Sequence, residues 1–225
     1  MLGIVKRLPS LPYILPFAQF VGFLGLNAVL RLSPLFEYPL RMVMVTLILP
    51  ITSRQTLSLP ARRLIESTVV GVAVFVIWVA PDLIWPSYRN HWLFENTLIG
   101  TATSSIPTVL RSHAIFLAFR LFGTAVVVPI IEELFWRGWL MRYLINSDFR
   151  AVPLGTYSAT SFCVTAIMFA SEHGSFWDVG LIAGIVYNWW MLQTKSLVDC
   201  ILAHAVTNAS LAIYVVGFQQ WQYWL

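Results

Sequence analysis

Three groups of polar residues in the second half of this chain could together hydrolyse an acyl bond such as a peptide. They are Glu132 with Glu133 and Arg137, Phe169 with His173, and His204 with Asn208. All lie in or beside apolar stretches, where a charged side chain costs about 2.5–3.5 kcal/mol on membrane-insertion scales. A carboxylate can act as general base toward water, a histidine can relay the proton, and a second histidine with an amide can donate to an oxyanion. The set therefore indicates water-activated hydrolysis.

The spacing within two of these groups places their side chains together. Residues four apart share one face of a helix. His204 and Asn208 would therefore project side by side from the last apolar segment. Phe169 would form an aromatic wall beside His173 in the same way.

The two adjacent glutamates point in different directions on a helix. Glu133 precedes Arg137 by four residues, which is the favourable orientation for an ion pair. Glu132 is rotated from Glu133 by about 100°. We therefore expect Glu133 and Arg137 to form a structural pair and Glu132 to face the site.

Each group also has a purely structural interpretation. A lone ion pair can pin two helices, and a lone His or Asn in a membrane helix is more often a hydrogen-bonder between helices than a catalyst. Asn188 is assigned to that class. Asp178 and Asp199 lie at helix starts and are typical of caps or first-turn acids. Glu172 could tune His173 or could simply be a solvated residue at a helix end. The joint occurrence of the three groups favours the catalytic interpretation.

The composition indicates the elements that must position these residues. Of 225 residues, 58% are hydrophobic and only 11% are charged, where a soluble domain has about 25%. The apolar runs are continuous rather than alternating, which argues against a β-barrel. The sequence therefore predicts an all-α, polytopic membrane helix bundle of about seven or eight helices. Such a protein contacts membrane lipids, and its net charge of +4 does not indicate nucleic-acid binding.

Hydropathy predicts the positions of the spans. They lie near residues 11–30, 42–53, 67–85, 114–131, 157–172, 179–193 and 197–218. The second is short, and we expect it to be tilted or partly inserted. Pro129 is expected to interrupt the fourth, with residues 132–145 following as a separate helix or a kinked extension. The chain is predicted to be one compact membrane domain, with N-terminal helices and a polar loop in residues 1–113 and the catalytic core in residues 114–225.

Three motifs resemble, in this order, those of one family of membrane proteases. They are Glu132-Glu133-Leu-Phe-Trp-Arg137, Phe169-Ala-Ser-Glu-His173 and His204-Ala-Val-Thr-Asn208. The family is that of the CAAX protease and bacteriocin-processing intramembrane proteases, which includes the type II CAAX prenyl endopeptidases. The resemblance covers roughly residues 114–218. The aromatic-rich first 110 residues resemble CAAX prenyl protease-related proteins encoded with exosortase sorting systems.

The resemblance implies an intramembrane endopeptidase that cuts a membrane-associated protein or peptide, which is lipidated in some relatives. Glu132 and His173 would activate water, and His204 with Asn208 would form the oxyanion hole. Glu133 and Arg137, the other two polar residues of the first motif, would hold the site together. In a bacterium the protein would lie in the inner (plasma) membrane.

Relatives are often labelled metalloproteases, so a metal must be considered. Glu132, His173 and His204 could serve as three zinc ligands with one open position. The chain has no His-Glu-x-x-His motif, however, and Asn208 is a better oxyanion donor than zinc ligand. We therefore expect a glutamate-based mechanism without a cofactor, with zinc as the alternative.

Two other functions compete with the peptidase. The same polar residues could hold together a non-enzymatic membrane partner or scaffold protein. Buried Glu and His also suit an ion- or proton-coupled transporter, although the chain is short and shows no inverted repeat.

Overall fold

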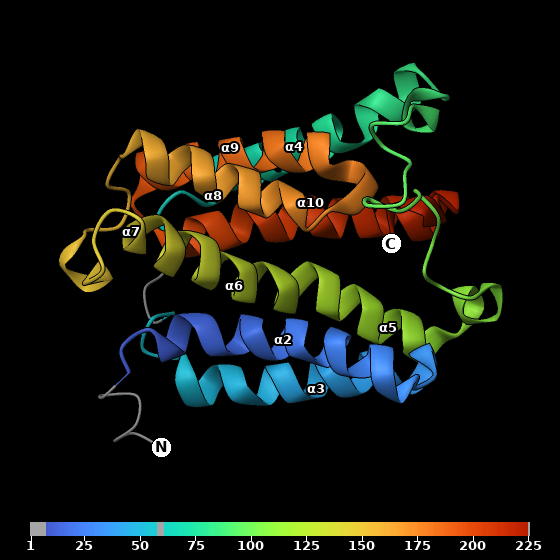
Figure 1. Ribbon diagram of the computed structural model, residues 1–225, viewed down its shortest axis with the longest axis horizontal. Coiled ribbons are helices and arrows are strands. Elements are labelled where there is room, and N and C mark those ends of the chain that lie inside the picture. Colours follow the sequence, from blue (N-terminus) through green and yellow to red (C-terminus); the bar gives the residue numbers. More distant parts are fainter. Residues whose placement is uncertain (1–7, 58–60, 225) are drawn as a thin grey trace.

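The computed structural model describes residues 8–57 and 61–224, which form a bundle of helices (Figure 1). Six of these helices are regular α-helices longer than ten residues: α2 (Leu11–Leu30), α3 (Pro34–Thr52), α4 (Leu64–Ile84), α8 (Ala159–Ser171), α9 (Trp177–Thr194) and α10 (Leu197–Phe218). A seventh, composite rod covers Ala114–Tyr143. The described residues contain no strand beyond one isolated bridge. The predicted all-α fold is confirmed.

Five of the helices are long and apolar enough to cross a membrane. They are α2, α3, α4, the composite rod and α10. The prediction of an integral membrane protein with a polytopic helical bundle is therefore confirmed. Helix α8 is apolar but shorter than these.

The predicted second span was too short. Helix α3 starts at Pro34 and has 19 residues. Hydropathy missed its first turns because Glu37 and Arg41 lie there. The two form an ion pair with Nε and Oε1 3.2 Å apart, and the Arg41 guanidinium lies 4.6 Å from the ring centre of Phe20. These contacts let two charged residues lie inside an apolar helix.

The composite rod carries the first motif and does not break at Pro129. It consists of α5 (Ala114–Phe122), a π-helical stretch (Gly123–Val127), α6 (Val128–Glu133), a second π-helical stretch (Leu134–Leu140) and α7 (Met141–Tyr143). Pro129 is the second residue of α6, which begins directly after the first π-helical stretch. The wider turn there accommodates a residue without an N–H, so the chain continues through it. The predicted interruption is wrong, and the expected extension beyond residue 132 is present.

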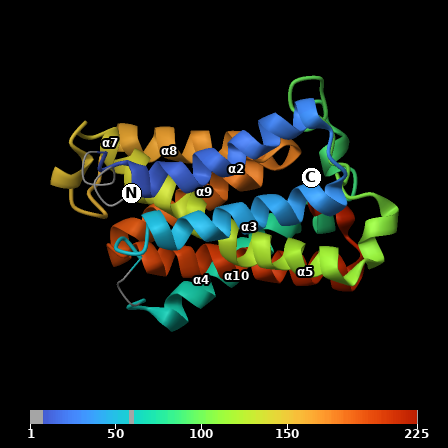
Figure 2. The same cartoon turned by 90° about the horizontal axis from the view of Figure 1, so that it is seen from below.

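The rod lies in the middle of the bundle. It packs against α2 and α3 on one side and against α10 and α8 on the other, with α4 and α9 also on that second side (Figure 1). In Figure 2, α3 lies beside α5, and the loop between α4 and α5 lies with the C-terminal 3₁₀ helix at one end of the bundle. The two halves of the chain thus contact each other along the whole rod.

Helices α4 and α10 approach closely at Gly71. A side chain at this position would clash with the backbone oxygen of Ala203. The approach allows Thr207 Oγ1 to donate to the Gly71 carbonyl oxygen at 2.8 Å. Small residues and hydrogen bonds of this kind join helices in lipid, where apolar burial alone drives little association. They fix the position of α10, which carries the third motif.

Candidate active site

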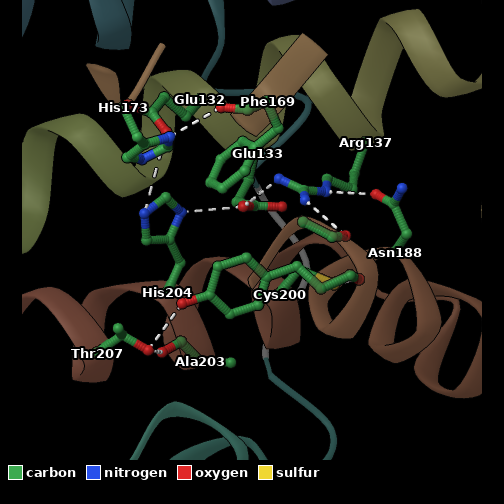
Figure 3. A network of polar contacts seen from close by, with 12 residues as sticks. Glu132, Glu133, Arg137, Phe169, His173, Asn188, Cys200, Ala203, His204 and Thr207 are labelled. Carbon is green, nitrogen blue, oxygen red and sulfur yellow. Dashed lines mark hydrogen bonds and ion pairs between the residues drawn. The ribbon is translucent and has the colours of Figure 1, made fainter. Parts of the chain in front are cut away.

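The expected ion pair of the first motif is present and fully buried. Arg137 Nη1 lies 2.9 Å from Glu133 Oε1, and both side chains have zero exposure (Figure 3). Arg137 also donates from Nε to Asn188 Oδ1 at 2.9 Å and from Nη2 to the Gly184 carbonyl oxygen at 3.2 Å. Buried charges persist only when they are paired and hydrogen-bonded in this way. The pair therefore anchors the composite rod to α9.

Asn188 extends this network to a third helix. Its Nδ2 donates to the Phe162 carbonyl oxygen on α8 at 2.9 Å. The residue joins helices, as expected of a membrane asparagine, but its partner is the arginine of the first motif. The sequence could not indicate this contact because Asn188 lies in no motif.

Glu132 faces a cavity, as its helical offset from Glu133 predicts. The cavity has a volume of about 310 Å³ and is lined also by His173, His204 and Asn208. The Glu132 side chain is 13% exposed, and its Oε2 has no hydrogen-bond partner in the described part of the chain. Buried polar atoms are nearly always hydrogen-bonded, so this oxygen is suited to bind water or substrate.

His204 lies between the two glutamates. Its Nδ1 is 3.0 Å from Glu133 Oε1, and its Nε2 is 4.0 Å from Glu132 Oε2 (Figure 3). Because an ionised carboxylate only accepts hydrogen bonds, Nδ1 is the donor toward Glu133. Tyr187 stacks on the imidazole with ring centres 4.9 Å apart, and its hydroxyl donates to Thr207 Oγ1 at 2.7 Å. The His204 ring is thus held at Nδ1 by Glu133 and on one face by Tyr187.

His173 lies in the turn that follows α8. Its Nδ1 is 2.8 Å from the Phe169 carbonyl oxygen, which can only accept, so Nδ1 carries the proton. The other ring nitrogen, Nε2, then presents a lone pair. The Phe169 ring lies 4.8 Å away, which agrees with the expected aromatic wall, and Trp78 meets the imidazole edge-on at 5.1 Å. Gly180 leaves room for the ring, since an added Cβ would lie 3.1 Å from it.

Asn208 completes the polar wall of the cavity. Its Nδ2 donates to the Thr124 carbonyl oxygen at 2.9 Å, in the first π-helical stretch. An amide nitrogen has two N–H groups, so this contact leaves the second one for another acceptor.

Residues 114–210 match the family model described as type II CAAX prenyl endopeptidase Rce1-like. This part of the chain, somewhat less than half of it, is similar to that family. The Rce1-like segment contains all three motifs, and the expected classification as a CAAX-type endopeptidase, a hydrolase of peptide bonds, is confirmed. Neither a curated protein nor a solved structure matches the chain. The exosortase-associated subgroup and the location in a bacterial inner membrane stay predictions.

The Rce1-like segment brings four of the expected residues to one cavity and places two behind it. Glu132, His173, His204 and Asn208 line the cavity. Glu133 and Arg137 are buried beside it and support His204 and the rod. Sequence reasoning missed the aromatic supports Tyr187 and Trp78, together with Thr207. An aromatic residue or a threonine in an apolar helix gives no signal that separates a site support from ordinary packing.

The zinc alternative does not fit the arrangement of the Rce1-like site. Among the described residues, no three or more His, Cys, Asp or Glu side chains are grouped so that they could hold a metal ion. Glu132, His173 and His204 therefore do not form the ligand set that zinc hydrolases use. The expectation of a mechanism without a cofactor stays a prediction.

Proposed function

We propose that this protein is an intramembrane endopeptidase that hydrolyses a peptide bond of a membrane-associated protein with a glutamate- and histidine-activated water. One observation carries the proposal. The Glu132 carboxylate lies in a cavity with one oxygen that accepts no hydrogen bond from the described residues, and His173 and His204 line the same cavity. A general base must lie within reach of the water from which it takes a proton, directly or through one further water.

The reaction needs one proton to move twice. The water oxygen attacks the carbonyl carbon, and a proton of that water passes to Glu132 or to Nε2 of His173. The oxyanion of the tetrahedral intermediate is stabilised by donors in the cavity wall. The C–N bond then breaks, and the same proton passes to the leaving amine. Side chains positioned as general acid and base typically accelerate such steps by about 10²–10⁴-fold.

Asn208 and His204 are the proposed oxyanion donors. Asn208 has a second amide N–H beyond the one bound to Thr124. His204 already donates from Nδ1 to Glu133, so its Nε2 can donate only if the imidazole is doubly protonated. A charged donor in a site that excludes water stabilises an oxyanion more strongly than a neutral one does.

Comparison of Glu132→Gln with Glu66→Gln tests the proposal. Glu66 is exposed at the start of α4 and does not line the cavity, so it serves as the matched control. Membrane proteomes of cells that express each variant would be searched for uncleaved polypeptides. We expect a polypeptide to accumulate in the Glu132→Gln cells and to disappear in wild-type and control cells. Identical proteomes in all three, with both variants folded, would support a non-enzymatic partner instead.

A further inference from the structure

His173 lies in a tight turn between α8 and α9. The turn consists of His173 and the 3₁₀ helix Gly174–Phe176, and α9 begins directly after it. Gly174 has a φ of +50°, a conformation that favours glycine, so the chain can pass from α8 into α9 within a few residues. The imidazole can keep its place in the cavity wall only if this turn keeps its shape.

Arg89 binds this turn from the connection between α4 and α5. Its Nη1 donates to the Ser175 carbonyl oxygen at 2.7 Å, and the same nitrogen pairs with Asp178 Oδ1 at 2.5 Å, in the first turn of α9. The guanidinium lies 4.4 Å from the ring centre of Phe176. Arg89 is only 8% exposed. A residue from a distant segment thus contacts the chain two, three and five positions after His173.

The guanidinium is itself fixed by a second carboxylate. Its Nε donates to Asp82 Oδ1 at 3.1 Å, near the end of α4. The other oxygen of each carboxylate accepts from a tyrosine, since Tyr223 donates to Asp82 Oδ2 at 2.9 Å and Tyr88 to Asp178 Oδ2 at 3.1 Å. Burial, followed by the charge of the neighbouring carboxylate, raises the pKa of each tyrosine and keeps its hydroxyl protonated. The arginine is thus held in one orientation by α4 and α9 together.

Arginine suits this position because its donors are spread over a rigid plane. One side chain reaches two carboxylates and one carbonyl oxygen here. Lysine carries a single ammonium group on a flexible stem and cannot hold all three acceptors in the same geometry. Hydrogen bonds between charged partners are shorter and stronger than neutral ones, so the two ion pairs fix the guanidinium that holds the turn.

We propose that Arg89 is a positioning residue for the hydrolytic reaction and acts on His173 through the backbone at Ser175. The inference rests on the proposed function, in which Nε2 of His173 faces the attacking water. Arg89 lies before residues 114–210, the segment that is similar to the Rce1-like family, and it is not among the residues that line the cavity. Its effect on catalysis therefore passes through the turn and not through contact with the substrate.

Comparison of Arg89→Lys with Arg142→Lys tests this inference. Arg142 is the matched control because it is also 8% exposed, lies over the rings of Tyr13 and Phe149, and donates to backbone carbonyl oxygens. It belongs to α7, at the opposite end of the bundle from the connection that carries Arg89, and is not among the residues that line the cavity (Figure 1). Both substitutions keep the positive charge, so neither leaves a carboxylate without a cation.

The kinetic measurement separates positioning from folding. The substrate is the best-cut member of a library of N-acylated peptides anchored in phosphatidylcholine vesicles, with mass spectrometry to locate the cut. We expect Arg89→Lys to lower kcat by about tenfold or more with KM within about twofold of wild type, since small displacements of catalytic groups are costly. Hydrogen exchange in detergent should show faster exchange of residues 173–178 in this variant. Arg142→Lys should keep kcat per folded molecule and the exchange of that segment.

A double variant shows whether Arg89 acts through His173. Gly180→Ala would place a Cβ 3.1 Å from the imidazole and displace the same ring. Substitutions that act on one group are not additive, so Arg89→Lys combined with Gly180→Ala should lose less kcat than the product of the two single effects. Arg142→Lys combined with Gly180→Ala should match that product.

Tyr88→Phe is a second variant that keeps the test decisive if Arg89→Lys does not fold. It removes the hydroxyl that donates to Asp178 and leaves every charge of the cluster in place. We expect kcat to fall by about twofold to threefold with KM unchanged, because one of the hydrogen bonds that orient the arginine is lost. An unchanged kcat in Tyr88→Phe would then overturn the inference.

Failure of this inference can be distinguished from failure of the proposed function. If wild-type protein cuts no peptide of the library, the proposed function fails, and this inference with it. If wild-type protein cuts and Arg89→Lys keeps its kcat, only the role of Arg89 is overturned. An equal loss of kcat in Arg142→Lys, or a loss in Arg89→Lys with unchanged exchange of residues 173–178, would likewise overturn it, because the effect would then not pass through this turn.

Discussion

The Nδ1 atom of His204 lies 3.0 Å from Oε1 of Glu133, the same oxygen that binds Arg137. The two residues are 71 positions apart in the chain, so this contact fixes α10 against the composite rod. It also determines which histidine nitrogen faces Glu132. The glutamate that touches no substrate in the proposed mechanism therefore orients the histidine that does.

The two glutamates of the first motif should respond differently to the same substitution. Glu132→Gln removes the general base and is expected to reduce turnover by about 10²-fold or more with little change in thermal stability. Glu133→Gln leaves Arg137 as a buried charge without its counter-ion, which costs about 3–5 kcal/mol. Thermal unfolding in detergent together with peptide cleavage measures both. Equal stability of the two variants would contradict the assignment of Glu133 as the structural partner.

Gly180→Ala tests the position of His173. The new Cβ would lie 3.1 Å from the imidazole and push it away from the cavity. We expect kcat to fall by about tenfold or more, since small displacements of catalytic groups are costly, while the helix remains folded. Gly217→Ala is the control, because a Cβ there meets nothing within 4 Å. If both variants keep wild-type kcat, His173 does not take part in the chemistry.

Two substitutions of Tyr187 separate its ring from its hydroxyl. Tyr187→Phe removes the hydrogen bond to Thr207 and keeps the ring on His204, and it should cost about 1 kcal/mol of stability with nearly full activity. Tyr187→Leu also removes the stacking and should lower kcat more than it lowers stability. A Leu variant as active as the Phe variant would show that the stacked ring does not position His204.

Metal removal tests the proposed mechanism directly. Because the candidate ligands are not grouped as a zinc site, incubation with a chelator should leave peptide cleavage at its original rate. The measurement is initial rate before and after chelation, followed by addition of zinc. Loss of activity on chelation that added zinc restores would contradict the proposal and show that a metal takes part in the reaction.

Much of the site could be predicted from the sequence because its members are polar residues in an apolar background. The Glu133–Arg137 pair and the direction of Glu132 follow from helix geometry alone. The contact between His204 and Glu133 could not be predicted, since it depends on how two distant helices rotate against each other. Asn188 joins helices as expected, but its partner Arg137 could not be predicted for the same reason.

Part of the fold escaped prediction for physical reasons of a different kind. Hydropathy treats Glu37 and Arg41 as breaks in a span, although their ion pair and the nearby Phe20 ring offset their charges. Pro129 was expected to end a helix, but the π-helical stretch before it removes the conflict. Both errors arise where a neighbouring contact, and not the residue type, decides the local structure.

The hydrogen bonds that join Arg137 to α9 and, through Asn188, to α8 also determine which wall of the cavity can move. Separating those helices from the rod would leave the Arg137 guanidinium without its hydrogen-bond partners on α9 in an apolar environment. Helix α2 contributes only apolar side chains to the cavity, Phe17, Phe20, Val21 and Leu24, and they can part from it without breaking a polar contact to the site. Admission of a peptide from the lipid should therefore occur by a sideways shift of α2. A covalent link between α2 and the composite rod, which it contacts directly, would stop turnover with the chemistry intact.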